Sequence, residues 1–153
     1  MRILWLASSA WVIGLDQFTK YLSIRYLTFD QEVSVLPGFA LTLRHNTGAA
    51  FSFLASASGW QRWFFILLAL VMSTIMFIWL GRLSEHAKQE SFALSLILGG
   101  ALGNLIDRLI HGYVVDFILL YYQKWQWPAF NVADTAICIG TILLIPILCK
   151  KNS

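Results

Sequence analysis

Two aspartates in apolar surroundings are the residues best suited to chemistry. Asp116 lies in the run Val-Val-Asp-Phe-Ile, and Asp134 ends the run Phe-Asn-Val-Ala-Asp. A carboxylate among such neighbours is costly unless it is paired, neutralised or used in a reaction. Two carboxylates brought together cannot both ionise easily, so the pair holds one proton. The ionised member can then take a proton from water while the protonated member donates to a carbonyl oxygen, which is aspartic-protease chemistry.

The composition places these aspartates in a membrane protein. Of 153 residues, 58% are hydrophobic and 12% are charged, whereas an ordinary soluble domain has roughly 25% charged residues. A helix needs about 20 residues to cross a bilayer, and apolar segments of this length predict four transmembrane helices. These segments are about 3–26, 63–80, 92–110 and 130–149. The length leaves room for one domain, 1–153, and a net charge of +3 without a basic cluster does not favour nucleic-acid binding.

Four acidic residues are predicted to lie at one depth. With about 1.5 Å of rise per residue, Asp16 and Asp107 each lie roughly 20 Å along the first and third spans. Asp116 follows the third span, and Asp134 lies one turn into the fourth. All four therefore collect on the side opposite the termini, and intramembrane ionisable residues are functional candidates. The distribution of Lys and Arg does not decide which side this is.

Asp16 and Lys20 lie four residues apart in the first span, in the favourable order for an ion pair on one helix face. They are consistent with a lysine that reaches the membrane surface beside a neutralising partner. They are equally consistent with groups that line the site. Ser23 lies three residues beyond Lys20, so a Ser–Lys nucleophile pair stays open as a weaker alternative.

The third span ends in a polar face. Asn104, Asp107 and Arg108 share that face, where Arg108 is expected to neutralise Asp107. Asn104 is expected to donate to a carboxylate or to a substrate backbone. Gly99 and Gly103 form a GxxxG pattern, whose expected use is close helix packing.

The segment after the first span loses the helical pattern. Residues 28–45 carry β-branched residues around a Pro37-Gly38 turn, which predicts a small strand-rich element outside the membrane. It should lie at the interface, because an open sheet edge cannot sit in lipid. Residues 51–60 are typical of a short interfacial helix. The stretch between Asp116 and Asp134 is interpreted as a loop rich in Tyr and Trp, which marks the lipid–water boundary.

Other classes receive less support. His45, His86 and His111 have no paired spacing and there is no HExxH motif, so no metal is expected. A small four-helix proton-coupled transporter would use Asp16 or Asp107 as its proton site. Such a transporter is expected to contain inverted repeats, and the two halves of this chain share no pattern.

Five sequence blocks carry a family resemblance. DQFTK, NTGAAFSF, GGALGNLIDR, VVDFI and FNVADTAI occur in this order between residues 16 and 137. Together they resemble the lipoprotein signal peptidases of bacteria, also called signal peptidase II. The resemblance implies a membrane-embedded aspartyl endopeptidase without cofactor or metal. Its implied substrate is a diacylglyceryl-modified prolipoprotein, cleaved just before the lipidated cysteine of the lipobox.

The resemblance also implies site residues and a location. The catalytic pair corresponds to Asp116 and Asp134. Residues that bind substrate or shape the site correspond to Asp16, Lys20, Asn46, Gly48, Asn104, Asp107, Arg108, Asn131 and Ala133. The expected location is the bacterial inner membrane, with both termini cytoplasmic and the active site toward the outer leaflet. The expected partners are membrane lipids and cyclic peptide inhibitors such as globomycin, and the expected state is a monomer.

Overall fold

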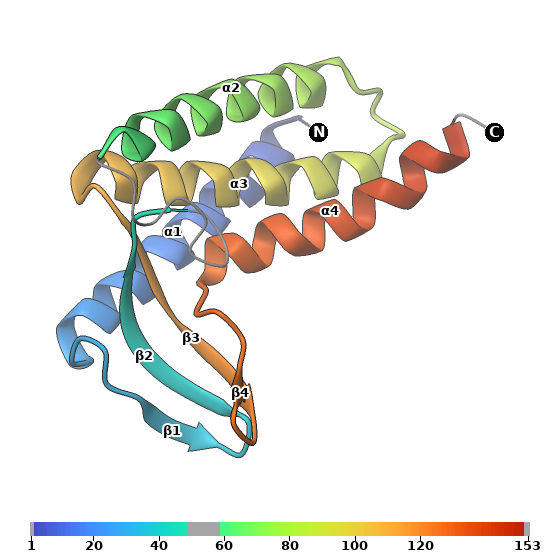
Figure 1. Cartoon of the computed structure of the whole chain (residues 1–153). Helices are drawn as coiled ribbons and strands as arrows, with labels where there is room; N and C mark the ends of the chain where they lie inside the picture. The colour runs from blue at the N-terminus through green and yellow to red at the C-terminus, as the bar shows by residue number, and fades with distance from the viewer. Residues whose placement is uncertain (1, 49–58, 152–153) are drawn as a thin grey trace.

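Long helices carry a curved sheet at one end in the computed structural model, which describes residues 2–48 and 59–151 (Figure 1). The helices are α1 (Arg2–Tyr26), α2 (Trp60–Arg82), α3 (Lys88–Ile110) and α4 (Val132–Lys151). The strands are β1 (Val33–Leu36), β2 (Phe39–Asn46), β3 (Val114–Tyr122) and β4 (Trp125–Gln126). α1 begins and α4 ends at the same end of the bundle, opposite the sheet (Figure 1).

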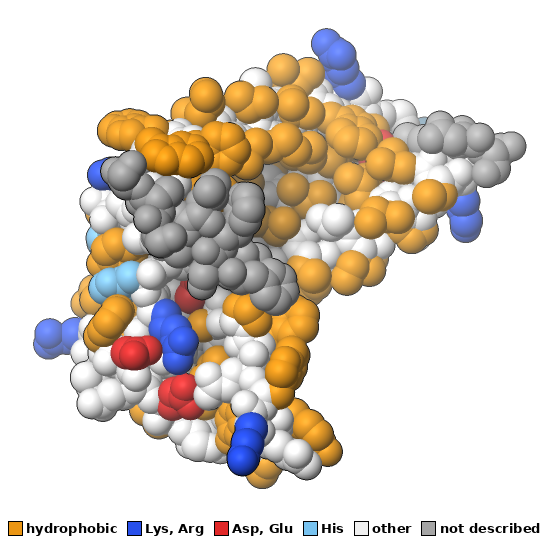
Figure 2. Space-filling model, in the orientation of Figure 1, with side chains coloured by type: hydrophobic (Ala, Val, Ile, Leu, Met, Phe, Trp, Pro, Cys, Tyr) orange, Lys and Arg blue, Asp and Glu red, His pale blue; other side chains and the backbone are white. Residues whose placement is uncertain are grey.

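Within residues 2–48 and 59–151, three helices are long and apolar enough to cross a membrane: α2, α3 and α4. They coincide with the predicted spans 63–80, 92–110 and 130–149. α1 has 25 residues, but Asp16, Lys20 and Arg25 lower its hydropathy. The structure thus supports three of the four predicted spans. Figure 2 agrees, because hydrophobic side chains cover most of the visible helical face while charged side chains lie at its ends and over the sheet.

Small residues let α3 pack closely against its neighbours. α3 contacts α1, α2 and α4, and it lies between α2 and α4 in Figure 1. A Cβ atom at Gly99 would lie 2.8 Å from the Ser9 carbonyl oxygen, and one at Gly103 would lie 2.7 Å from the Asp16 carboxylate. The prediction that the GxxxG pattern serves close packing is therefore confirmed. An apolar cluster fills the other end of the bundle, formed by Met76, Leu80, Ala93, Leu94, Leu98 and Leu144.

We expect Gly99→Ala to lower the free energy of unfolding by about 1–3 kcal/mol, because the added methyl group would force α1 away from α3. Gly14→Ala in α1 is the matched control, since a Cβ there meets nothing within 4 Å. That control should stabilise the helix by about 0.5–1 kcal/mol. Thermal unfolding in detergent measures both variants. Equal melting temperatures would contradict the close contact.

The sheet is antiparallel, in the order β1-β2-β3-β4. β1 and β2 confirm the strand-rich element predicted over residues 28–45. The interpretation of the stretch between Asp116 and Asp134 as a loop was wrong in part, because residues up to Tyr122 belong to β3 and residues 125–126 form β4. Their β-branched and aromatic residues suit a strand, but the partner strand β2 lies far away in the sequence. The pairing places Asp116 opposite Arg44 and so ties the third helix to the sheet.

Most of the predicted interfacial helix over residues 51–60 falls outside the residues that the structure describes. Residues 51–58 lie outside the described part of the chain. Trp60, the last residue of that segment, is the first residue of α2.

Candidate active site

A cavity of about 690 Å³ lies where the helices meet the sheet. Asp116 from β3 and Asp134 from α4 both line it. Asn46, Asn104 and Arg108 also line it, so residues distant in the sequence meet there. A concave site with a few convergent polar groups on a largely apolar wall is the usual form of a substrate pocket.

Asp116 is buried and held by two amides. Its Oδ1 accepts a hydrogen bond from Asn131 Nδ2 at 2.7 Å, and its Oδ2 accepts one from Asn46 Nδ2 at 3.0 Å. Burial, followed by the charge of Asp134, raises the pKa of Asp116 to about 7. The bonds from Asn46 and Asn131 and the charge of Lys20 oppose that rise. Asp116 therefore exchanges its proton near neutral pH.

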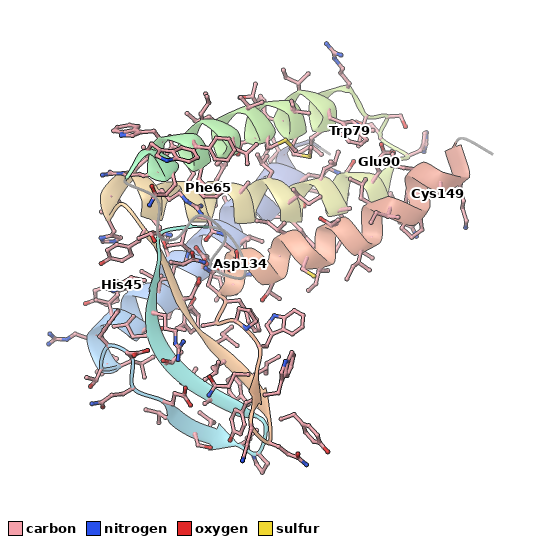
Figure 3. All side chains as sticks on the ribbon, viewed as in Figure 1. His45, Phe65, Trp79, Glu90, Asp134 and Cys149 are labelled. Carbon is pink, nitrogen blue, oxygen red and sulfur yellow. The ribbon has the colours of Figure 1, made fainter. Side chains whose placement is uncertain are left out.

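Asp134 lies in the first turn of α4, where the bundle meets the sheet (Figure 3). Its backbone N–H donates to Asn131 Oδ1 at 2.9 Å, so Asn131 caps the helix. Its Oδ1 accepts from Asn104 Nδ2 at 2.8 Å. The N-terminal end of a helix favours a negative charge. Because Asn131 also donates to Asp116, one buried side chain links the carboxylate of Asp116 to the backbone of Asp134.

Lys20 lies inside the protein between two carboxylates. Its Nζ is 2.8 Å from Asp16 Oδ2 and 2.9 Å from Asp107 Oδ2. It also donates to Asn104 Oδ1 at 3.0 Å. Its side chain is only 3% exposed, so Lys20 does not reach the membrane surface. The close ion pair of Asp107 is with Lys20 from another helix, whereas Arg108 interacts with Asp107 only through the charge.

Arg108 instead holds the backbone beside the cavity. One of its Nη2–H groups donates to the Gly48 carbonyl oxygen at 2.8 Å, and its guanidinium lies 5.0 Å from the centre of the Phe65 ring. The Gly48 N–H donates to Asn46 Oδ1 at 3.0 Å. Arg108, Gly48 and Asn46 thus form a hydrogen-bonded path that ends at Asp116.

The carboxylates of Asp16 and Asp107 also bind backbone N–H groups. The Ala133 N–H donates to Asp16 Oδ1, and the Val115 N–H donates to Asp107 Oδ2, each at 2.9 Å. The ion-pair cluster therefore anchors the residue beside each candidate catalytic aspartate. Ser23 Oγ donates to the Thr19 carbonyl at 2.8 Å, which gives the Ser–Lys alternative no support.

Two polar residues of the site were missed from the sequence. Gln17 donates from Nε2 to Asp107 Oδ1 at 2.8 Å, and a glutamine beside Asp16 in an apolar helix was a signal for it. His45 lines the cavity and stacks on Tyr113 with ring centres 3.9 Å apart. Burial, followed by the charge of His111, lowers the pKa of His45.

Helices able to cross a membrane, joined to two carboxylates that line one cavity, define a membrane protein with an acidic site. Two solved structures, both of bacterial membrane enzymes crystallised by the in meso method, share this fold. One, at 2.3 Å resolution, has a TM-score of 0.86 and 31% identity, covering 98% of this chain and 90% of the other. The second, at 1.9 Å, has a TM-score of 0.82 and 30% identity, covering 95% and 92%.

The family model for signal peptidase (SPase) II matches residues 8–150. A lipoprotein signal peptidase of Alteromonas mediterranea is 50% identical over 95% of this chain and 79% of its own length. That of Acinetobacter baumannii is 52% identical over 94% of this chain and 82% of its own length. The chain belongs to the signal peptidase II family, whose members are aspartic-type peptidases. It is a bacterial membrane protein.

Proposed function

We propose that this protein removes the signal peptide from diacylglyceryl-modified prolipoproteins by cleaving just before the lipidated cysteine. The observation that carries the proposal is the pair of aspartates on one cavity, buried Asp116 and half-buried Asp134. Asn131 binds the carboxylate of Asp116 and the backbone N–H of Asp134. Membership of the signal peptidase II family supports the substrate class. The acid–base chemistry needs two carboxylates and water, so the proposal includes no metal or cofactor.

In the proposed mechanism, Asp116 holds the shared proton and Asp134 is ionised. A pKa near 7 at Asp116 and the helix N-terminus at Asp134 support this division. Asp134 takes a proton from water as the water oxygen attacks the scissile carbonyl. Asp116 donates its proton to the carbonyl oxygen. As the C–N bond breaks, Asp134 returns a proton to the leaving amine, and the reforming carbonyl returns one to Asp116.

We propose that α1 is the fourth span. Large apolar side chains such as Trp11, Leu15 and Phe18 are exposed on its surface, while Asp16 and Lys20 are buried in the bundle. A lipid-facing apolar surface around a satisfied polar interior is what a membrane requires. The common end of α1 and α4 supports placing both termini on one side of the membrane, with the sheet and the active site toward the other (Figure 1). We propose that the termini are cytoplasmic and the site faces the outer leaflet, as the family resemblance implies.

Exposed aromatic residues support this depth. Tyr122, Trp125 and Trp127 lie exposed on the sheet, and such residues prefer the lipid–water interface. A lipid-anchored peptide bond would reach the cavity at that level. A cyclic peptide such as globomycin would block the aspartates by occupying the same cavity. One chain supplies every proposed site residue, so a monomer is the proposed active unit.

The test uses purified protein in detergent with no proton gradient. A gel-shift assay follows cleavage of a diacylglyceryl-modified prolipoprotein, and the same prolipoprotein without the lipid serves as control. Cleavage of the lipidated substrate alone is expected. No cleavage by a folded protein would reject the proposal. Proton-linked flux in vesicles would then favour the transporter.

Asn46→Leu should change the pH dependence of cleavage. The lost hydrogen bond normally lowers the pKa of Asp116, so that pKa rises in the variant. Activity is lost when Asp116 releases the shared proton. The alkaline limb of the curve of kcat against pH should therefore move to higher pH by about one unit. The limb is read from kcat between pH 5 and 9, with Gln126→Leu on the exposed sheet as control. An unchanged limb, or a shift to lower pH, would contradict the assignment.

A further inference from the structure

Arg62, in the first turn of α2, binds the end of another helix. Its Nε–H donates to the Arg108 carbonyl oxygen at 3.0 Å, and its Nη2–H donates to the Leu109 carbonyl oxygen at 2.9 Å. The last carbonyls of a helix have no partner within the helix, and a cation there is favourable. Arg62 thus caps the C-terminus of α3 with a two-pronged contact that a lysine cannot reproduce.

α2 holds Arg108 at two points. Arg62 binds its backbone carbonyl. Phe65, one turn further along α2 (Figure 3), has its ring centre 5.0 Å from the Arg108 guanidinium. The position of the Arg108 side chain therefore depends on the register between α2 and α3. Arg62 also contacts the turn that leads from α3 into β3. A Cβ at Gly112, whose φ is +84°, would lie 3.4 Å from Arg62 Nη1.

Two series of contacts connect Arg62 to Asp116, and these are its two routes to the site. The first passes through Arg108 to the Gly48 carbonyl, then from the Gly48 N–H to the Asn46 amide that binds Asp116. The second follows the chain from Gly112 into β3. We infer that Arg62 is a positioning residue for the catalytic pair, acting without contact with the substrate. This inference rests on the proposed function of the site.

The charges around Asp116 set the sign of the expected pH effect. Asp134 from α4 and Lys20 from α1 act on Asp116, and Arg108 from α3 interacts with it across the cavity. Releasing the Asn46 amide and displacing the positive charge of Arg108 both raise the pKa of Asp116. Loss of Arg62 should therefore move the alkaline limb of kcat to higher pH, in the same direction as Asn46→Leu.

The experiment compares Arg62→Lys and Arg62→Gln in the full-length protein in detergent, with diacylglyceryl-modified prolipoprotein as substrate. We expect kcat to fall about tenfold in Arg62→Gln and less in Arg62→Lys, with KM within about twofold of wild type. In both variants, the pH at which kcat falls on the alkaline side should be higher than in wild type. Arg25→Gln, an exposed arginine at the end of α1, removes the same charge and should leave kcat and the limb unchanged.

A double variant separates positioning from a purely structural cap. Since the first route from Arg62 passes through Asn46, the loss of kcat in Arg62→Gln/Asn46→Leu should be smaller than the product of the two separate losses. A lower melting temperature with wild-type kcat and pH profile would overturn the inference, as would additive losses. If Arg62→Gln does not fold, the same readouts on Arg62→Lys decide. Failure of wild type to cleave would reject the proposed function, whereas full activity in the Arg62 variants would reject only this inference.

Discussion

Replacing Asp116 or Asp134 by asparagine is expected to lower kcat by at least about a thousandfold. A carboxamide has the size of a carboxylic acid, but it neither takes a proton from water nor supplies one to the carbonyl oxygen. Asp116 is 3% exposed and its pKa is raised to about 7, so its ionised form is disfavoured in the folded protein. Asp116→Asn removes this disfavoured charge, but its single amide oxygen can accept from only one of Asn46 and Asn131. The two effects oppose each other, so the melting temperature should change little while activity disappears.

The gel-shift assay with lipidated prolipoprotein measures this loss, and thermal unfolding verifies the fold. Asp30→Asn is a matched control because Asp30 lies on the exposed surface, and its positive φ of 57° suits asparagine as well. The control should cleave at the wild-type rate. Near-normal cleavage by folded Asp116→Asn or Asp134→Asn would remove that residue from the catalytic pair, with Asp16 and Asp107 the next candidates.

Lys20→Met is expected to destabilise the protein by about 3–5 kcal/mol, because breaking a buried ion pair leaves uncompensated charge. Asp16 and Asp107 would then face each other without the cation that now lies 2.8 Å and 2.9 Å from their oxygens. Asn104 would also lose its bond from Lys20, and Asn104 binds Asp134. Cleavage should therefore fall together with stability.

The melting temperature in detergent measures the effect, and Lys124→Met on the exposed turn after β3 is the matched control. Neutralising both acids in the same chain, as Asp16→Asn/Lys20→Met/Asp107→Asn, should recover part of the lost stability because no unpaired carboxylate remains. A melting temperature of Lys20→Met equal to that of Lys124→Met would contradict a buried ion-pair cluster. A triple variant no more stable than Lys20→Met would assign the loss to packing instead of charge.

The sequence by itself determined which residues are candidates for the site and roughly where they lie. Runs of apolar residues predicted the helices that became α2, α3 and α4, because membrane thickness sets their length. The rarity of charge in such a chain made Asp16, Asp107, Asp116 and Asp134 stand out, and helical rise placed them at one depth. The pair Asp16–Lys20 was also readable, since residues four apart share a helix face.

Only the tertiary structure decided how those residues are connected. Local spacing assigned Asp107 to Arg108, but Lys20 from another helix is its partner. β3 was missed because its partner strand comes much earlier in the chain. The double role of Asn131 and the cap formed by Arg62 also join distant segments. Periodicity and spacing reveal contacts between near neighbours, whereas the hydrogen bonds that set the chemistry of Asp116 exist only once distant segments have packed together.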